Sequence, residues 1–137
     1  MNRTDFQQLA EERLLDAQML LAAQRWSGAY YIAGYAVECG LKACVAKLTN
    51  QYDFPDKSFA QSCFTHNLDT LIDIARLKSD LDNDMASNQE LGANWVTVRA
   101  WKEDARYQLK NQVEAVELYT AVAEQTNGVM QWIKLRW

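Results

Sequence analysis

The sequence predicts an all-α protein. Apolar residues recur at steps of three and four along several long segments, no segment alternates apolar and polar residues between turn dipeptides, and proline occurs only once. The chain has 137 residues, of which 49% are hydrophobic, enough for one core but not for two independent ones. We therefore expect a single domain over residues 1–137, built as an up-and-down bundle of four main helices and a short fifth.

The first predicted helix runs from Asp5 to Gln24. Thr4, with Gln7 three residues later, has the spacing of a capping box at its start. The apolar face consists of Phe6, Leu9, Ala10, Leu14, Ala17, Leu20 and Leu21. Because the turn that follows is short, the next helix should return antiparallel to the first.

The stretch Arg25 to Lys47 predicts a central helix, with Ser27 as its N-cap. It carries two adjacent apolar rows, which a helix on the surface would not need. One row is Tyr30, Gly34, Val37, Leu41, Val45 and Leu48, and the other, of small residues, is Ala29, Ala33, Ala36, Gly40 and Cys44. We expect the other helices to assemble around this one, or the helix to lie at a dimer interface.

A third row on the same helix is polar and aromatic, and we call it the seam: Tyr31, Tyr35, Glu38 and Lys42. Glu38 stands four residues before Lys42, the spacing of a helical ion pair. Two interpretations remain open. The tyrosines cover the edge of the core, or the seam forms a groove for a ligand such as a nucleotide.

The middle of the chain is less regular. A loop is predicted from Thr49 to Ser62, around Pro55, with Tyr52, Phe54 and Phe59 packing it down. A helix from His66 to Leu77 follows, and Thr65 is its expected cap. Its expected inward positions are Leu68, Leu71, Ile72 and Ala75.

The acidic stretch Lys78 to Asn94 predicts weak helix or irregular structure, because its apolar residues are sparse. The segment from Trp95 to Trp101 should return to the core, before a turn over Lys102 to Arg106. The last and longest helix is predicted from Tyr107 to Trp132, with Gly128 as its only weak point. Its apolar period is Val113, Val116, Tyr119, Ala123, Thr126, Met130 and Ile133.

Composition narrows the function classes. The net charge of −4 argues against a broad basic surface for nucleic acid, although a local basic patch stays open. We see neither a signal-peptide pattern nor a membrane span, and expect a cytoplasmic protein with its three cysteines reduced. No pattern predicts a cofactor or a metal site; His66, Asp69 and Asp73 have workable helical spacing, but surface helices carry such triplets by chance.

Three phrases together resemble one family. They are LAEERLLDAQMLLAAQRWSGAYYIAGYAVECGLKA, FTHNLDTLIDIA, and NWVTVRAWKEDARY followed by a long helix ending in GVMQWI. In this order they are similar to bacterial HEPN domains (higher eukaryotes and prokaryotes nucleotide-binding). The resemblance implies a HEPN-like helical bundle, a homodimer, and pairing with a small nucleotidyltransferase of the kind found in toxin–antitoxin systems.

HEPN proteins that cleave RNA carry an arginine followed, after four to six residues, by a histidine. The chain departs from this pattern: its single histidine, His66, has no arginine at that distance, and neither Arg99 nor Arg106 is followed by a histidine. We interpret His66 as a structural residue that helps to cap its helix. The missing arginine–histidine motif therefore favours a noncatalytic module, and no catalytic residue is assigned.

Two hypotheses follow. The first is a noncatalytic module that binds a nucleotide or RNA, with Arg99 or Arg106 approaching the seam. The second is a divergent metal-independent ribonuclease that uses His66 or the pair Arg106 and Tyr107. The ligand-binding residues predicted by the first hypothesis are Tyr31, Tyr35, Glu38, Lys42, Arg99 and Arg106.

Overall fold

The computed structural model confirms the all-α class. It describes residues 1–49, 52–54 and 56–137, and within these ranges it contains α-helices and one 3-10 helix but no strand. The helices are more numerous and shorter than predicted, since eight α-helices take the place of four or five. They are α1 (Arg3–Ala22), α2 (Trp26–Ala46), α3 (Lys57–Ser62), α4 (Leu68–Ile74), α5 (Lys78–Ser87), α6 (Gln89–Arg99), η1 (Glu103–Tyr107), α7 (Gln112–Ala123) and α8 (Val129–Lys134).

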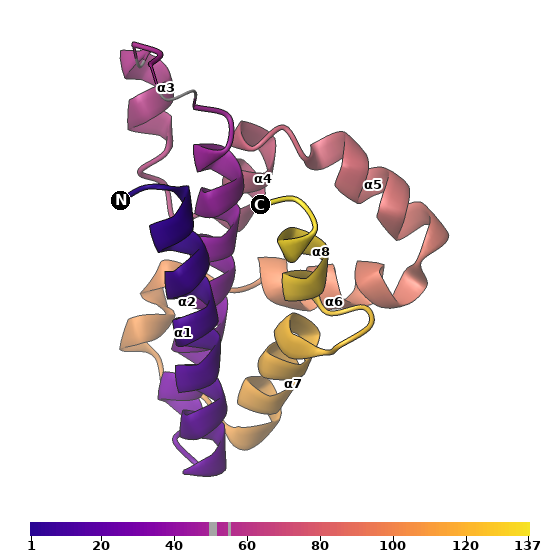
Figure 1. Ribbon diagram of the computed structural model, residues 1–137. Coiled ribbons are helices and arrows are strands. Elements are labelled where there is room, and N and C mark those ends of the chain that lie inside the picture. The colour runs from indigo at the N-terminus through magenta and orange to yellow at the C-terminus, as the bar shows by residue number, and fades with distance from the viewer. Residues whose placement is uncertain (50–51, 55) are drawn as a thin grey trace.

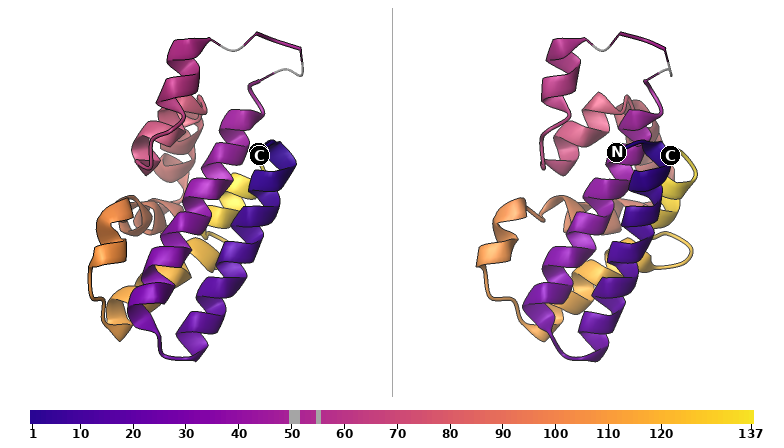
Figure 2. Two further views of the ribbon diagram at one scale, coloured as in Figure 1. Left: turned by 90° about the vertical axis from the view of Figure 1, so that its left-hand side faces the viewer. Right: turned by 60° about the vertical axis from the view of Figure 1, so that its left-hand side comes forward.

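Helices α1 and α2 form the predicted antiparallel hairpin (Figures 1 and 2). The predicted cap of α1 is wrong by two residues. The Asn2 side chain accepts a hydrogen bond from the Asp5 N–H at 3.0 Å, and the Asp5 carboxylate accepts one from the Asn2 N–H at 2.9 Å. Gln24 makes the turn with a left-handed φ of 58°.

The start of α2 also differs from the prediction. The helix begins at Trp26, and its N-cap residue, Arg25, makes no capping hydrogen bond through its side chain. Ser27 is inside the first turn, where its hydroxyl accepts a hydrogen bond from the Lys110 N–H at 2.8 Å. Ser27 therefore ties α2 to the segment before α7 rather than capping its own helix.

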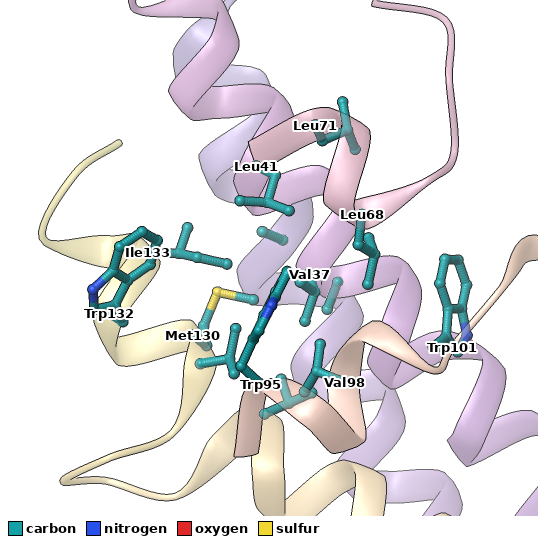
Figure 3. Close-up of a cluster of buried hydrophobic side chains, with 14 of the residues drawn as sticks. Val37, Leu41, Leu68, Leu71, Trp95, Val98, Trp101, Met130, Trp132 and Ile133 are labelled. Atoms are coloured by element: carbon teal, nitrogen blue, oxygen red, sulfur yellow. The ribbon is translucent and has the colours of Figure 1, made fainter. Parts of the chain in front are cut away.

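Helix α2 is the centre of the molecule, as predicted. It contacts α1, α4, η1, α7 and α8, and most of its residues from Ala29 to Val45 are buried. Val37 and Leu41 lie among apolar side chains from α4, α6 and α8 (Figure 3). The cluster around them includes Leu68, Leu71, Trp95, Val98, Met130 and Ile133.

The loop predicted over residues 49–62 is partly wrong. Its second half forms α3, capped by the Asp56 side chain, while Pro55 lies outside the described residues. Tyr52 and Phe54 are 91% and 98% exposed, so they do not pack the segment down. Of the three aromatic residues only Phe59 packs against the core.

Helix α4 keeps its predicted buried face but is shorter. Its N-cap is Asn67, whose side chain accepts a hydrogen bond from the Thr70 N–H at 2.9 Å, so the prediction of Thr65 as the cap is wrong. His66 consequently lies before the helix rather than in its first turn. The predicted inward residues are all buried: Leu68, Leu71, Ile72 and Ala75.

The acidic stretch is helical, so of the two predicted alternatives, weak helix and irregular structure, the structure shows helix. Asn88 ends α5 and caps α6 by accepting a hydrogen bond from the Leu91 N–H at 3.1 Å. The carboxylate of Asp84 accepts hydrogen bonds from Trp132 Nε1 and from Arg136, both at 2.7 Å. These bonds to the C-terminal segment anchor a helix that buries few apolar residues.

The predicted long final helix is divided into α7 and α8, whereas η1 occupies the predicted turn over Lys102 to Arg106. The break between α7 and α8 has a local cause, because the Glu124 carboxylate accepts hydrogen bonds from the backbone N–H groups of Thr126 and Asn127. The bond from Asn127 is the main reason that the pKa of Glu124 is lowered. Gly128 follows as the N-cap of α8, where a Cβ would lie 2.3 Å from the Glu124 carbonyl oxygen.

The predicted apolar period is only partly the face that the core uses, because Tyr119 packs against the core whereas the first two members of the period do not. Val113 and Val116 are 63% and 42% exposed. The residues that α7 buries form a different row: Ala115, Leu118, Ala121 and Val122. The helix thus carries two apolar rows, of which the core uses one.

In the part of the chain that the structure describes, no helix is both long and apolar enough to cross a membrane.

Candidate functional site

The seam of α2 lies beside the segment that joins α6 to η1. The rings of Tyr31 and Tyr35 are stacked, with centroids 6.3 Å apart and planes within 3°. Tyr31 also stacks on Trp101, at 6.0 Å and 29°. Trp101 reaches this position because Gly34 has no side chain: a Cβ there would lie 2.3 Å from the indole ring. The glycine therefore brings three aromatic rings into one group.

Glu38 is the buried charge of this region. It is 2% exposed, and its Oε1 atom accepts hydrogen bonds from Lys42 Nζ at 2.9 Å, as the helical spacing predicts, and from His66 Nδ1 at 2.8 Å. Its other oxygen, Oε2, is buried without a hydrogen-bond partner among the described residues. A buried carboxylate is costly unless it is well paired. Both of its partners are therefore expected to matter for the local structure.

His66 is the residue that sequence reasoning placed wrongly. Its side chain is 44% exposed and connects two carboxylates, with Nδ1 on Glu38 and Nε2 at 3.4 Å from Glu103 Oε2. It does not cap α4. The contact joins residues 28 positions apart, so no local pattern could have found it.

Arg106 completes a row in which basic side chains alternate with carboxylates. Its Nη1 atom lies 2.9 Å from Glu103 Oε1, and its guanidinium stands 4.9 Å from the centre of the Tyr107 ring. The predicted approach of Arg106 to the seam is thus indirect, through Glu103 and His66. We call this row the ionic chain: Lys42, Glu38, His66, Glu103 and Arg106.

Arg99, the other arginine predicted for the seam, has a different partner. Its Nη2 atom lies 2.9 Å from the Asp69 carboxylate, and both side chains are about half exposed. This pair joins α6 to α4 outside the ionic chain. Among the residues that the structure describes, no three His, Cys, Asp or Glu side chains are placed to hold a metal ion, and His66, Asp69 and Asp73 are no exception.

Burial keeps one tyrosine and two cysteines of α2 in their neutral forms. Burial is the main cause that raises the pKa of Tyr35 to about 12, with Cys39 contributing. Burial likewise raises the pKa of Cys39 and of Cys44 to about 11. Because the thiolate is the nucleophilic form, these two cysteines are poor candidates for covalent catalysis.

The arrangement offers two chemical capacities. The partly exposed tyrosines and the exposed Arg106 supply aromatic rings and a guanidinium, the groups that contact bases and phosphates. An imidazole held by a buried carboxylate has the geometry of an acid–base pair, but here Nε2 faces a second carboxylate.

Comparison of the chain with protein-family models, curated proteins and solved structures gave no match.

Proposed function

We propose that the chain is a noncatalytic, HEPN-like binding module that takes a nucleotide or a short stretch of RNA at the seam. The observation that carries the proposal is the ionic chain beside the stacked rings of Tyr31, Tyr35 and Trp101. It supports binding because cationic groups and aromatic rings lie in one place on a protein whose net charge is −4.

The arrangement of the ionic chain favours binding over catalysis. Both ring nitrogens of His66 face carboxylates, so neither is directed to a substrate. Arg106, which lies 45% exposed at the outer end, is held by a single carboxylate that a phosphate could replace. Arg106 is therefore the residue expected to contact the ligand.

Fluorescence anisotropy with a labelled single-stranded RNA and with a fluorescent ATP analogue tests this, both in EDTA. Arg106→Gln should weaken binding about tenfold, the loss of one charge-assisted contact worth roughly 1.4 kcal/mol. Arg99→Gln is the matched control, because Arg99 is equally exposed but pairs with Asp69. Equal affinity of the two variants would remove the seam as the site.

A divergent ribonuclease is the second candidate, favoured by the contact of 2.8 Å between Glu38 and His66 Nδ1. If Glu103 turned wholly to Arg106, Nε2 of His66 would be free to exchange a proton with a substrate. The assay is cleavage of structured and single-stranded RNA by the wild type, His66→Ala, and the double variant His66→Ala/Arg106→Ala. Cleavage that these changes abolish would replace the binding proposal, and an inactive wild type would leave the ribonuclease without support.

The proposed partners rest on the resemblance alone. They are a second copy of the chain and a small nucleotidyltransferase, in a system of toxin–antitoxin type. The product of the adjacent gene, co-expressed with this chain, should co-purify with it if it is such an enzyme. Light scattering at micromolar concentration should report a dimer, and a strict monomer would contradict that part of the proposal.

A further inference from the structure

Helix α7 presents an apolar row that nothing in the described structure covers. Its inner row, which includes Leu118 and Val122, is buried in the core. The outer row of Val113 and Val116, one turn apart, is 63% and 42% exposed. A helix that only had to close the bundle would need one apolar row, not two.

Helix α1 has a similar row on its solvent side. Leu15 and Met19, also one turn apart, are 57% and 69% exposed. Helices α1 and α7 are in contact, and Leu15 and Tyr119 line one groove of about 380 Å³ between them. We call the combined surface the α1–α7 face; in Figures 1 and 2, α7 lies near the end of the hairpin at which the turn joins α1 to α2. Its apolar members are Leu15, Met19, Val113, Val116 and Tyr119.

The charges around the α1–α7 face are acidic. Glu12 on α1 and Glu117 on α7 are exposed and have no ion-pair partner among the described residues. The cations nearby are already engaged, since Arg13 pairs with Asp16 at 3.3 Å and Lys134 pairs with Glu11 at 3.3 Å. A second copy placed on this face would bring carboxylates toward carboxylates. A cationic partner would neutralise them.

We propose that the α1–α7 face binds a cationic amphipathic helix of a partner protein. The apolar side of that helix would cover the rows on α1 and α7, and its lysines or arginines would pair with Glu12 and Glu117. This is the helix-in-groove mode of recognition, in which residues one turn apart act as anchors. The surface is separate from the seam, so the inference does not depend on the proposed nucleotide or RNA site.

The probe is a fluorescein-labelled amphipathic peptide of about 14 residues made of leucine and lysine, with a scrambled peptide of the same composition. Anisotropy in roughly 50 mM salt should show binding of the first peptide but not of the second. Met19→Ser/Val116→Ser should weaken it about tenfold through lost apolar contact. Glu12→Gln/Glu117→Gln should weaken it about fivefold, an effect that roughly 0.5 M salt should abolish.

Matched controls separate this face from the rest of the surface. Val96→Ser removes a valine that is 63% exposed on α6, and Asp73→Asn/Asp104→Asn removes two exposed carboxylates away from the face. Both should bind the peptide as the wild type does, with unchanged thermal unfolding in all variants. Absence of peptide binding, equal binding of the scrambled peptide, or equal loss in the controls would overturn the proposal. A dimer that Met19→Ser/Val116→Ser dissociates in light scattering would overturn it in favour of a second copy.

Discussion

Helix α2 contacts the rest of the molecule through two unlike surfaces. Toward α8, Gly40 admits Met130 and Ile133, whose side chains would lie 3.4 and 3.1 Å from an added Cβ. Toward η1, Gly34 admits Trp101, and the residue one turn later is the buried Glu38. Figure 3 shows Trp101 on the opposite side of the core cluster from Ile133.

The difference is in what the close approach achieves. On the α8 side it yields apolar packing and nothing else. On the η1 side it places an indole against two tyrosines and next to a chain of five charged or titratable side chains. The surface with the buried carboxylate is the better candidate for function. Burying a carboxylate costs free energy that apolar packing at the same place would not cost.

The largest expected effect is from Gly34→Ala. A Cβ there would lie 2.3 Å from three atoms of the buried Trp101 ring, so the indole must leave its site. We expect the free energy of unfolding to fall by roughly 3 kcal/mol, the upper end for overpacking. Chemical denaturation measures it.

Gly28→Ala is the control for this variant, because its Cβ would meet only Leu20, at 3.5 Å. It should leave stability unchanged or raise it by up to about 1 kcal/mol, since alanine is the better helix former. If the two variants were equally stable, the close contact of α2 with Trp101 would be wrong.

The next effect concerns the buried carboxylate. Glu38→Ala removes the shared acceptor of Lys42 and His66, and we expect a loss of about 2 kcal/mol, reduced from the full cost of breaking a buried pair because His66 is 44% exposed. Glu38→Met/Lys42→Met removes both charges of the inner pair and should cost less than the single change. A double variant that is no more stable than Glu38→Ala would contradict a buried pair at this position.

The features that depend on neighbouring residues of one helix could be predicted from the sequence. Helical spacing alone predicted the pair of Glu38 with Lys42 and the buried face of α4, and both are present. It also predicted α2 as the central helix, because two apolar rows on one helix need partners on two sides. These features depend on neighbours one turn away in the same helix.

What was missed depends on distant or competing contacts. His66 meets Glu38 across 28 residues, and nothing near His66 in the sequence indicates it. The final helix is broken because the Glu124 side chain accepts hydrogen bonds from backbone N–H groups. A longer helix would have used these groups for its own backbone hydrogen bonds. The face of α7 was misjudged because both of its rows have helical period, and periodicity cannot tell the core from an exposed surface.

The stability of the protein should depend on pH through Tyr35, which lies in the seam of α2. Burial raises the pKa of Tyr35 to about 12, above its ordinary value of 10, so the folded protein holds this proton more tightly than the unfolded chain. The stabilisation is complete below pH 10 and is lost as the pH rises toward 12. Unfolding followed between pH 8 and 11 should show a decline in stability that begins above pH 9, where the buried thiols of Cys39 and Cys44 contribute, and Tyr35→Phe should make the part above pH 10 shallower. An unchanged decline in that variant would assign the effect to other groups, with Cys39 the nearest.

The smallest expected effect distinguishes the ionic chain from an ordinary surface ion pair. Arg106 and Arg99 are 45% and 51% exposed and each is held by one carboxylate at 2.9 Å, so Arg106→Gln and Arg99→Gln should each change the stability little. They should differ in what happens to the imidazole. Without Arg106, Glu103 keeps His66 as its one ionic partner among the described residues, whereas the loss of Arg99 leaves that contact untouched. The NMR signals of the His66 imidazole, recorded at one pH, should therefore shift in Arg106→Gln and not in Arg99→Gln, because only the first change removes a partner of the carboxylate that faces Nε2. Identical imidazole signals in the two variants would show that Glu103 does not couple Arg106 to His66, and the ionic chain would then end at Glu38.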